Sequence, residues 1–434
     1  MSLREPFAFH VTASEGAARR GTLRTPHGIV QTPAFMPVGT LGAVKAVTHR
    51  ELEDIGAEII LGNTYHLHVR PGDELIARAG GLHAFIGWPH PILTDSGGYQ
   101  VFSLASRRRV DEDGVVFRSH LDGALHALSP ETATDIQARL GSDIAMVLDE
   151  CVASEERGAR SEEGGARSEK EGATGDEGGA SGEERGTTIS GSRPSALAPR
   201  PSDIRSAMER SMRWATRARA RMLQLRDDSS SMSDVRITNP GQAQFGIVQG
   251  GTDSALRSES AQATVAIGFE GYAIGGLSVG EPPPVMYDVV AHTAPLLPAD
   301  NPRYLMGTGM PDDLIECVAR GIDMFDCVLP TRNARNGQLL TQHGVLVIKN
   351  ARYAEDREPP DSDCRCYTCR SFSRAYLRHL FMSQEMAAAT LLSVHNLYFY
   401  LDLMRRIRDA ISFDSFGKLR QEFHQTFSRR PCST

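Results

Sequence analysis

Eight short apolar runs recur along the chain, and each ends in glycine or in polar residues. The runs are AFMPVG, EIILGNTYH, PILTDSGG, IAMVLDE, FGIVQGG, GYAIGGL, RYLMGTG and MFDCVLP. Helix-like stretches such as residues 129–140 and 255–266 separate most of them. Short apolar runs between helices are typical of buried parallel strands. The pattern predicts an α/β fold. Because eight strand–helix units are present, we expect a (β/α)8 TIM barrel. A doubly wound open sheet is the alternative.

One segment interrupts this pattern directly after the fourth run. Residues 155–186 consist of the seven-residue repeats EERGARS, EEGGARS, EKEGATG and DEGGASG, followed by EERG. No position of the repeat is consistently apolar and glycine recurs throughout, so a coiled coil is not expected. We predict a disordered, mildly acidic insertion over about residues 154–200, in a loop at the mouth of the barrel. Its deletion is expected to leave folding and activity intact.

Composition restricts the class of protein. The net charge is −7, so an RNA-binding site would have to be a local patch, and arginines are frequent in the C-terminal third. No apolar run approaches the roughly 18 residues of a membrane helix. The N-terminus MSLREPFAFH has no apolar signal-peptide core. Seven cysteines, an odd number, indicate a reducing compartment, and a cytoplasmic protein is expected.

Three of the cysteines have the spacing of a metal site. Cys364, Cys366 and Cys369 lie in the polar, turn-rich segment DSDCRCYTCR, and His395 follows in LLSVHNLYFY. Three thiolates and one imidazole match a closed, tetrahedral and therefore structural zinc site. His379 is also within reach as the fourth ligand, but His395 is favoured because its apolar surroundings leave the ring without another partner.

The same motif divides the chain. Residues 1–363 are expected to form the barrel, including the insertion, and to begin with a hairpin of residues 7–11 and 28–34. Residues 364–434 are expected to form a zinc-binding subdomain and C-terminal helices that complete the barrel.

Three carboxylates follow or end predicted strands. Asp95 follows ILT, Asp149 ends the run IAMVL, and Asp326 lies inside MFDCVLP, upstream of Arg332 and Arg335. Strand ends of a barrel meet at one mouth, so these acids are expected to converge there. Displacement at a sugar carbon needs a nucleophile, a proton carrier and a group that reads the leaving group. Helix capping or ion pairing is the alternative for each acid taken singly.

Glycine pairs at three strand ends accompany these acids. The pairs are Gly97-Gly98, Gly250-Gly251 and Gly275-Gly276, and none fits a dinucleotide fingerprint or a P-loop. At a barrel mouth they would let backbone N–H groups approach a flat heterocycle. Tyr99 and Met306 could enclose that ring, although ordinary core packing explains them equally well.

Together the motifs resemble those of one family. The motifs are DSGGYQ, LDEC, GIVQGG, GGLSVGE, YLMGTG, FDCVLPTR and the C-x-C-x2-C…H set. They are similar to those of the tRNA-guanine transglycosylases, also called queuine tRNA-ribosyltransferases, over nearly the whole chain outside about residues 153–200. The resemblance implies a TIM barrel with a zinc subdomain and a pentosyltransferase activity. That activity exchanges guanine at the anticodon wobble position (34) of GUN-anticodon tRNAs for a 7-deazaguanine, through a covalent enzyme–RNA intermediate.

The resemblance also implies roles for individual residues. Asp326 resembles the nucleophile that attacks ribose C1′, and Asp95 the proton acceptor and donor. The implied base-binding residues are Asp95, Ser96, Gly97, Gly98, Tyr99, Asp149, Gln249, Gly276, Leu277 and Met306. The implied tRNA-binding residues are Gly307, Thr308, Gly309, Met310, Pro311, Asp312, Asp313, Thr331, Arg332, Asn333, Ala334 and Arg335. The implied zinc ligands are Cys364, Cys366, Cys369 and His395.

Details of the motifs favour one branch of this family. Cys151 and Tyr99 resemble the bacterial form, which inserts 7-aminomethyl-7-deazaguanine (preQ1) in queuosine biosynthesis. The alternatives are a queuine-inserting form and a non-catalytic tRNA-binding subunit, but the latter should lack the nucleophile. A barrel glycosidase or metal hydrolase is disfavoured by the closed ligand set. A homodimer is expected by resemblance, with Phe372 and Tyr376 as candidate contacts.

Overall fold

A computed structural model describes residues 7–104, 108–151, 201–227, 235, 237–427 and 429 of the chain. The predicted disordered insertion at about residues 154–200 lies outside the described residues. The first described strand follows directly on residue 7, and the last described helix ends at Thr426.

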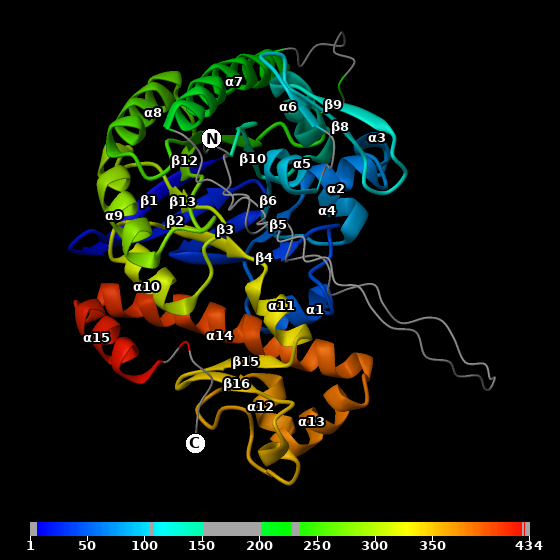
Figure 1. Cartoon of the computed structure of the whole chain (residues 1–434), viewed down its shortest axis with the longest axis vertical. Coiled ribbons are helices and arrows are strands. Elements are labelled where there is room, and N and C mark those ends of the chain that lie inside the picture. The colour runs from blue at the N-terminus through cyan, green and yellow to red at the C-terminus, as the bar shows by residue number, and fades with distance from the viewer. Residues whose placement is uncertain are drawn as a thin grey trace, which may run out of the picture.

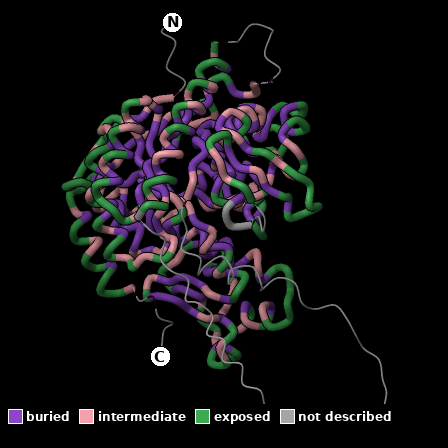
Figure 2. The backbone as a smooth tube through the Cα atoms, turned by 45° about the horizontal axis from the view of Figure 1, so that its top comes forward, coloured by how far each residue is buried: buried purple, intermediate pink, exposed green. Residues whose placement is uncertain are grey.

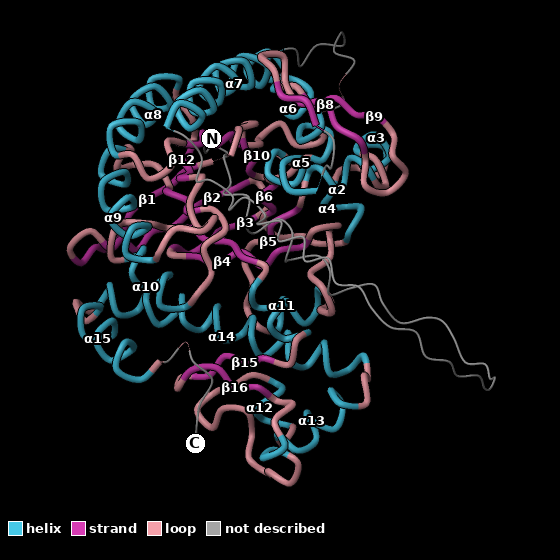
Figure 3. The backbone as a smooth tube through the Cα atoms, in the orientation of Figure 1, coloured by secondary structure: helices cyan, strands magenta, loops and turns pink. Residues whose placement is uncertain are grey.

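Eight parallel strands close into a barrel, which confirms the predicted fold (Figures 1 and 3). The barrel strands are β4 (Ala34–Gly39), β5 (Ile60–Gly62), β6 (Ile92–Thr94), β10 (Ile144–Met146), β11 (Ala243–Val248), β12 (Gly271–Ile274), β13 (Arg303–Leu305) and β14 (Met324–Cys327). Each of the eight apolar runs holds one of them. Closure is made where β14 pairs with β4, with Met324 opposite Ala34 and Cys327 opposite Pro37.

Most barrel strands are buried on both sides. Every residue of β5, β6, β10, β11, β12 and β13 is buried. Their apolar side chains join one large core cluster and a second one beside it, and buried residues concentrate in the barrel region in Figure 2. Parallel strands covered on both faces read as continuous apolar runs, which is why the sequence revealed them.

Helices surround the barrel and follow most of its strands. They are α1 (His49–Asp54), α2 (Thr64–Val69), α3 (Asp73–Arg78), α4 (Leu82–Ile86), α5 (Gly98–Leu104), α6 (Pro130–Leu140), α7 (Pro201–Asp227), α8 (Ser254–Ile267), α9 (Pro283–Thr293), α10 (Pro311–Val318) and α11 (Leu329–Arg335). Local sequence fixes several of their starts. Thr48 and Glu51 form a capping box before α1, and Ser129, followed by Pro130, caps α6.

Two three-stranded sheets lie outside the barrel. The first, β1 (Ala8–Glu15), β2 (Ala18–Thr25) and β3 (Gly28–Thr32), is antiparallel. The expected hairpin of residues 7–11 and 28–34 was therefore wrong: β1 and β3 do not pair with each other, because β2 lies between them and pairs with both. The second sheet, β7 (Arg108–Val110), β8 (Val115–Arg118) and β9 (Leu125–Leu128), was not predicted.

The first sheet crosses the N-terminal end of the barrel. Arg19 of β2 is hydrogen-bonded to Asp323, the residue before β14. On the other side, His27 Nδ1 lies 2.9 Å from Oδ1 of Asp143, the residue before β10. His83 Nε2 lies 3.0 Å from the other Asp143 oxygen, and the two imidazole rings stack with centroids 3.5 Å apart. Asp143 is fully buried and also accepts the Ile92 backbone N–H, so this carboxylate ties three segments together.

The C-terminal part forms a separate layer below the barrel in Figure 1. It contains the hairpin β15 (Gln338–Thr341) and β16 (Gly344–Val347), followed by α12 (Tyr367–Ser371) and α13 (Arg374–Met382). The long helix α14 (Met386–Ser412) runs between this layer and the barrel, and α15 (Phe416–Thr426) follows it. α14 packs against β4 and β1 as well as against α11, α12 and β15. Among the helices of the described residues, none is both long and apolar enough to cross a membrane.

Candidate functional site

Predicted site residues from six strands gather at one end of the barrel. Asp95, Asp149, Gln249, Gly276 and Met306 follow the ends of β6, β10, β11, β12 and β13, and Asp326 lies within β14. All eight strands are parallel, so these positions share the C-terminal face on which barrel active sites are built. The strand pairing thus brings together the polar groups that the sequence placed at strand ends.

Asp326 is oriented by two donors on one of its oxygens. The Tyr304 hydroxyl donates to Oδ1 at 2.6 Å and the Gly307 N–H donates to the same atom at 2.8 Å. Within the described residues, no hydrogen bond occupies Oδ2. Burial raises the pKa of Asp326, and the two hydrogen bonds oppose this rise. The result is a carboxylate with one fixed oxygen and one available oxygen.

Asp95 is held from the neighbouring strand end. Its Oδ2 accepts from Asn63 Nδ2 at 2.7 Å, and its Oδ1 accepts from the N–H groups of Thr64 and Gly97 at 2.9 and 3.1 Å. Burial raises the pKa of Asp95 to about 7, and the negative charge of Asp326 adds to the rise. A carboxyl group with this pKa is present in both protonation states near neutral pH, as a proton carrier requires. Asp95 follows β6 and Asp326 lies in β14 of the same parallel barrel, so both acids belong to one mouth.

Asp149 forms a second polar group deeper in the site. Its Oδ2 accepts from Gln249 Nε2 at 2.6 Å, and Ser96 Oγ lies 3.4 Å from its Oδ1. All three side chains are buried. Burial raises the pKa of Asp149 to about 6, so the carboxylate predominates at neutral pH. A buried carboxylate beside an amide complements a ligand edge that carries both donors and an acceptor.

Glycines are required where the backbone approaches Gln249. A Cβ on Gly275 would lie 2.7 Å from Gln249 Nε2, and one on Gly276 would lie 2.4 Å from its Oε1. Gly276 also has φ +66°, a left-handed conformation that favours glycine. Leu277, the next residue, is buried. These glycines therefore place their backbone against the Asp149–Gln249 pair.

The two residues expected to enclose a flat ring differ in exposure. Tyr99 lies in the first turn of α5 with 53% of its surface exposed, next to the Gly97-Gly98 turn. Met306 is partly buried and packs against the barrel core. Their roles as ring contacts stay predictions.

The segments expected to contact tRNA contain both exposed and buried residues. Arg332 and Arg335 of α11 are exposed, as is Gly307. The buried members are Thr308, Gly309, Pro311, Asp313, Thr331 and Ala334. Asp313 is bonded to the Tyr287 hydroxyl and pairs, like Asp312, with Arg429. The exposed arginines of α11 therefore remain the charged groups of these segments that face solvent.

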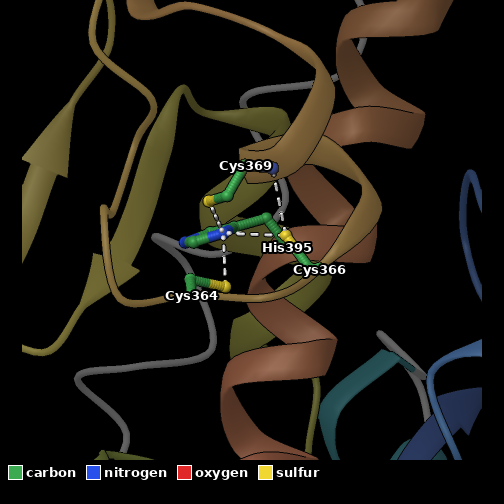
Figure 4. A group of neighbouring side chains, drawn as sticks. All are labelled: Cys364, Cys366, Cys369 and His395. Atoms are coloured by element: carbon green, nitrogen blue, oxygen red, sulfur yellow. Dashed lines mark hydrogen bonds between the residues drawn. The ribbon is translucent and has the colours of Figure 1, made fainter.

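The four predicted metal ligands also converge, in the C-terminal layer. Nδ1 of His395 lies 3.8, 3.5 and 3.2 Å from the Sγ atoms of Cys364, Cys366 and Cys369 (Figure 4). The other ring nitrogen, Nε2, donates to the Leu340 carbonyl at 2.8 Å, which leaves the Nδ1 lone pair facing the sulfur atoms. This arrangement could hold a metal ion. His379, the alternative fourth ligand, is exposed and lies outside the cluster.

Two supporting residues, Tyr304 and Arg257, were missed by the sequence analysis, whereas Asn63 is predicted at the barrel mouth as a polar strand-end residue without a role of its own. Asn63 and Tyr304 hold the carboxylates of Asp95 and Asp326, and both lie within the quoted strand-end motifs, where a polar side chain is a usable signal. Arg257 is fully buried beside Gln249, although its place in a helix predicts an exposed side chain. No local pattern distinguishes it from a surface arginine.

Sequence comparisons identify relatives over almost the whole chain. A family model described as queuine tRNA-ribosyltransferase matches residues 14–173 and 194–429. A protein named queuine tRNA-ribosyltransferase from Thermoanaerobacter pseudethanolicus is 48% identical over 413 residues, 94% of each chain. One from Nitratidesulfovibrio vulgaris is 49% identical over 426 residues, 97% of this chain and 98% of the relative. One from Lawsonia intracellularis is 48% identical over 423 residues, 97% and 99% of the two chains.

Proposed function

The chain belongs to the queuine tRNA-ribosyltransferase family, and from that premise we propose that it exchanges guanine in tRNA for preQ1 by double displacement at the barrel mouth. The expected substrates are GUN-anticodon tRNAs, at the wobble position. The relatives matched over nearly their whole length are bacterial, which supports preQ1 as the incoming base. The queuosine pathway is the setting of this exchange.

In the first step, Oδ2 of Asp326 attacks ribose C1′ of the bound nucleotide. A C1′–O bond forms as the C1′–N9 bond breaks, and the bonding electron pair leaves with guanine. Tyr304 and Gly307 hold Oδ1, so the free oxygen has a fixed direction. Orientation of this kind lowers the entropic cost of reaching the transition state.

Asp95 manages the proton in both steps. Its neutral form donates a proton to the departing guanine, and the resulting carboxylate takes a proton from the incoming base. That base then attacks C1′ and displaces the Asp326 oxygen, which restores the enzyme. The pKa of Asp95, raised to about 7, suits a group that must act as an acid and then as a base.

Asp149 and Gln249 would recognise the edge of the base by hydrogen bonds. The Asp149 carboxylate would accept from N1–H and N2–H2 of guanine, while Gln249 and the Gly276 N–H would donate to O6. The Leu277 carbonyl would accept from the aminomethyl group at C7. Contact between Asp149 and Gln249 at 2.6 Å supports one continuous recognition edge. A ligand lacking these groups would leave buried polar atoms unpaired.

The tRNA phosphates would meet the exposed cations beside the nucleophile. Arg332 and Arg335 are solvent-exposed on α11, directly after β14. Loop nucleotides are commonly splayed out and read on their base edges, which is how a barrel mouth can admit one purine.

The cysteine–histidine cluster would hold one structural Zn2+. Zinc bonds of about 2.0 Å to nitrogen and 2.3 Å to sulfur at a tetrahedral angle separate N and S by about 3.5 Å. The three Sγ–Nδ1 distances of 3.8, 3.5 and 3.2 Å bracket this value. When bound, zinc would fold the C-terminal layer; with four protein ligands it keeps no open position for the substrate.

A homodimer is the proposed assembly. Beside the cysteines, Tyr367 and Tyr376 are 60% and 45% exposed, and Phe372 stacks on Tyr376 with centroids 5.4 Å apart. Aromatic residues are enriched at interfaces, which supports this face as the contact. A monomeric mass in light scattering at micromolar concentration, with wild-type activity, would exclude this assembly.

The unoccupied oxygen of Asp326, at the same barrel mouth as Asp95, is the observation that carries the proposal. The test incubates the protein with an unmodified GUN-anticodon tRNA and resolves covalent adducts on a denaturing gel, alongside exchange of labelled guanine. Asp326→Ala is expected to lose adduct and exchange, and Asp326→Glu to keep little. Asp288→Ala, an exposed aspartate on α9, is the control. Unimpaired exchange by Asp326→Ala would remove this residue from its role.

The same assay separates the alternatives. A queuine-inserting form would accept queuine in competition with preQ1, whereas the proposed form selects preQ1. A non-catalytic subunit would yield no adduct, but the presence of both Asp326 and Asp95 argues against it.

A further inference from the structure

Arg257 lies buried behind the proposed base-binding edge. It belongs to the first turn of α8 and its side chain is fully shielded from solvent. Nη1 donates to the Val248 carbonyl, Nε to that of Gly251 and Nη2 to that of Gly275, each at 2.8 Å. Each of the three guanidinium nitrogens thus donates to a backbone carbonyl.

These acceptors lie on the two loops that form the base edge. Val248 and Gly251 flank Gln249, and Gly275 directly precedes Gly276. Nη2 would be 3.7 Å from a Cβ placed on Gly276, so the cation lies immediately behind that backbone. One side chain therefore fixes the separation between the two groups proposed to meet O6.

The positive charge at this place is unfavourable for folding. Among the described residues, Arg257 forms no ion pair, and the three carbonyls are the only hydrogen-bond acceptors of its side chain. The first turn of a helix also repels a cation, because the N-terminal end of the dipole is positive. Burial lowers the pKa of Arg257 to about 10, so the charge persists at neutral pH.

The positive charge of Arg257 can stabilise negative charge that develops during the reaction. When the C1′–N9 bond breaks, its electron pair passes to the purine, and part of the negative charge spreads to O6 before Asp95 delivers the proton. Donors aimed at the site of developing charge stabilise the transition state more than the ground state. Gln249 and Gly276 are the donors at O6, and a cation behind them strengthens both.

We propose that Arg257 is a positioning residue for guanine exchange, which aligns Gln249 and Gly276 and stabilises the departing purine anion through them. The proposal rests on the proposed function and adds the source of leaving-group stabilisation. It assigns Arg257 no direct contact with the substrate.

The test compares Arg257→Lys and Arg257→Met with matched variants of Arg303. Arg303 is another buried arginine, at the opposite end of the barrel, where its Nη2 donates to the Leu297 carbonyl at 2.9 Å. The readouts are kcat, KM for guanine, KM for tRNA and the melting temperature. A second incoming base, 8-azaguanine, has a more acidic ring N–H and needs less stabilisation as an anion.

Arg257→Met is expected to lower kcat/KM for guanine by about 100-fold, and Arg257→Lys by about 10-fold, with KM for tRNA within about twofold of wild type. The loss with 8-azaguanine should be several-fold smaller. The Arg303 variants should lower the melting temperature without a base-dependent loss. Arg257→Lys keeps the test decisive if Arg257→Met does not fold.

An equal loss of kcat/KM for guanine and for 8-azaguanine would overturn the inference and leave Arg257 a structural residue. So would an equal change in the KM for guanine and the KM for tRNA. Arg257 variants with the same kinetics and melting temperature as the Arg303 variants would also overturn the inference, but would leave the proposed function standing. A wild-type protein that does not exchange guanine would overturn the proposed function, and the inference with it.

Discussion

The Tyr304 hydroxyl lies 2.6 Å from Oδ1 of Asp326, the same oxygen that accepts the Gly307 N–H. Tyr304 is buried in β13, which pairs with β14, so the contact joins two neighbouring strands of the barrel. Burial and the charge of Asp326 raise the pKa of Tyr304, which keeps the phenol protonated as a donor. The direction of the Asp326 carboxylate is thus fixed by a residue outside its own strand.

Tyr304→Phe should slow formation of the covalent intermediate by about 10- to 100-fold, because a hydrogen bond to a charged group contributes about 1.5–3 kcal/mol. Single-turnover adduct formation measures this rate. Tyr400→Phe is the matched control, since this buried phenol donates to the Gly309 carbonyl and does not touch Asp326. A Tyr304→Phe rate equal to that of the control would refute the orienting role.

Acidification should weaken guanine binding through Asp149. Its pKa of about 6 means that the carboxylate is lost as the pH falls below 6. The dissociation constant should then rise about tenfold per pH unit. Calorimetric titration with guanine at pH 5 to 8 measures binding without proton transfer. Asp149→Asn should bind weakly at every pH, whereas Asp95→Asn should keep the slope; a wild-type constant that is flat across this range would contradict the assignment.

Cys366→Ala should abolish stoichiometric metal binding and lower the melting temperature by about 10 °C, because a structural metal contributes directly to folding. Plasma mass spectrometry gives the metal content and calorimetry the melting temperature. Cys317→Ala removes a buried cysteine outside the cluster and should keep the metal. The zinc assignment fails if Cys366→Ala retains its metal and its melting profile.

Asp143→Asn should lower the free energy of unfolding at pH 7 by about 2–4 kcal/mol, because the carboxylate bonds both His27 and His83. Hydrogen bonds from these imidazoles, against the opposing effect of burial, hold the pKa of Asp143 well below its usual range. Its contribution is therefore complete above the unfolded pKa of about 4 and is lost as the pH falls further.

Urea unfolding at pH 7 and at pH 3.5 tests this sign. The difference between wild type and Asp143→Asn should shrink at the lower pH, while exposed Asp54→Asn should match wild type at both. A difference that grows on acidification would show that the pairing acts in the opposite sense.

The barrel and most of its polar mouth could be predicted because their signals are local. Each strand is a continuous apolar run, and Asp95 and Asp149 directly follow such runs. β2 was missed because Ala18–Thr25 holds three arginines and a glycine, and it becomes a strand only by pairing on both sides with β1 and β3.

Arg257 shows the other limit of sequence reasoning. In its helix it looks like any surface arginine, and only tertiary packing buries it among three carbonyls. Asp143 likewise reads as a residue before a strand, because its partners His27 and His83 lie far away in sequence. Such contacts depend on the tertiary fold, and no periodic pattern in the sequence predicts them.

The pairing of β4 with β14 has a consequence for biosynthesis. The first strand of the ring reaches its second neighbour only after Cys327 has left the ribosome, and α14, which packs on β4, ends at Ser412. Until then the nascent polypeptide carries an open apolar edge. The ring can therefore be sealed only after the last of its strands has been made, and until then its unpaired strand edges are open to association with other chains.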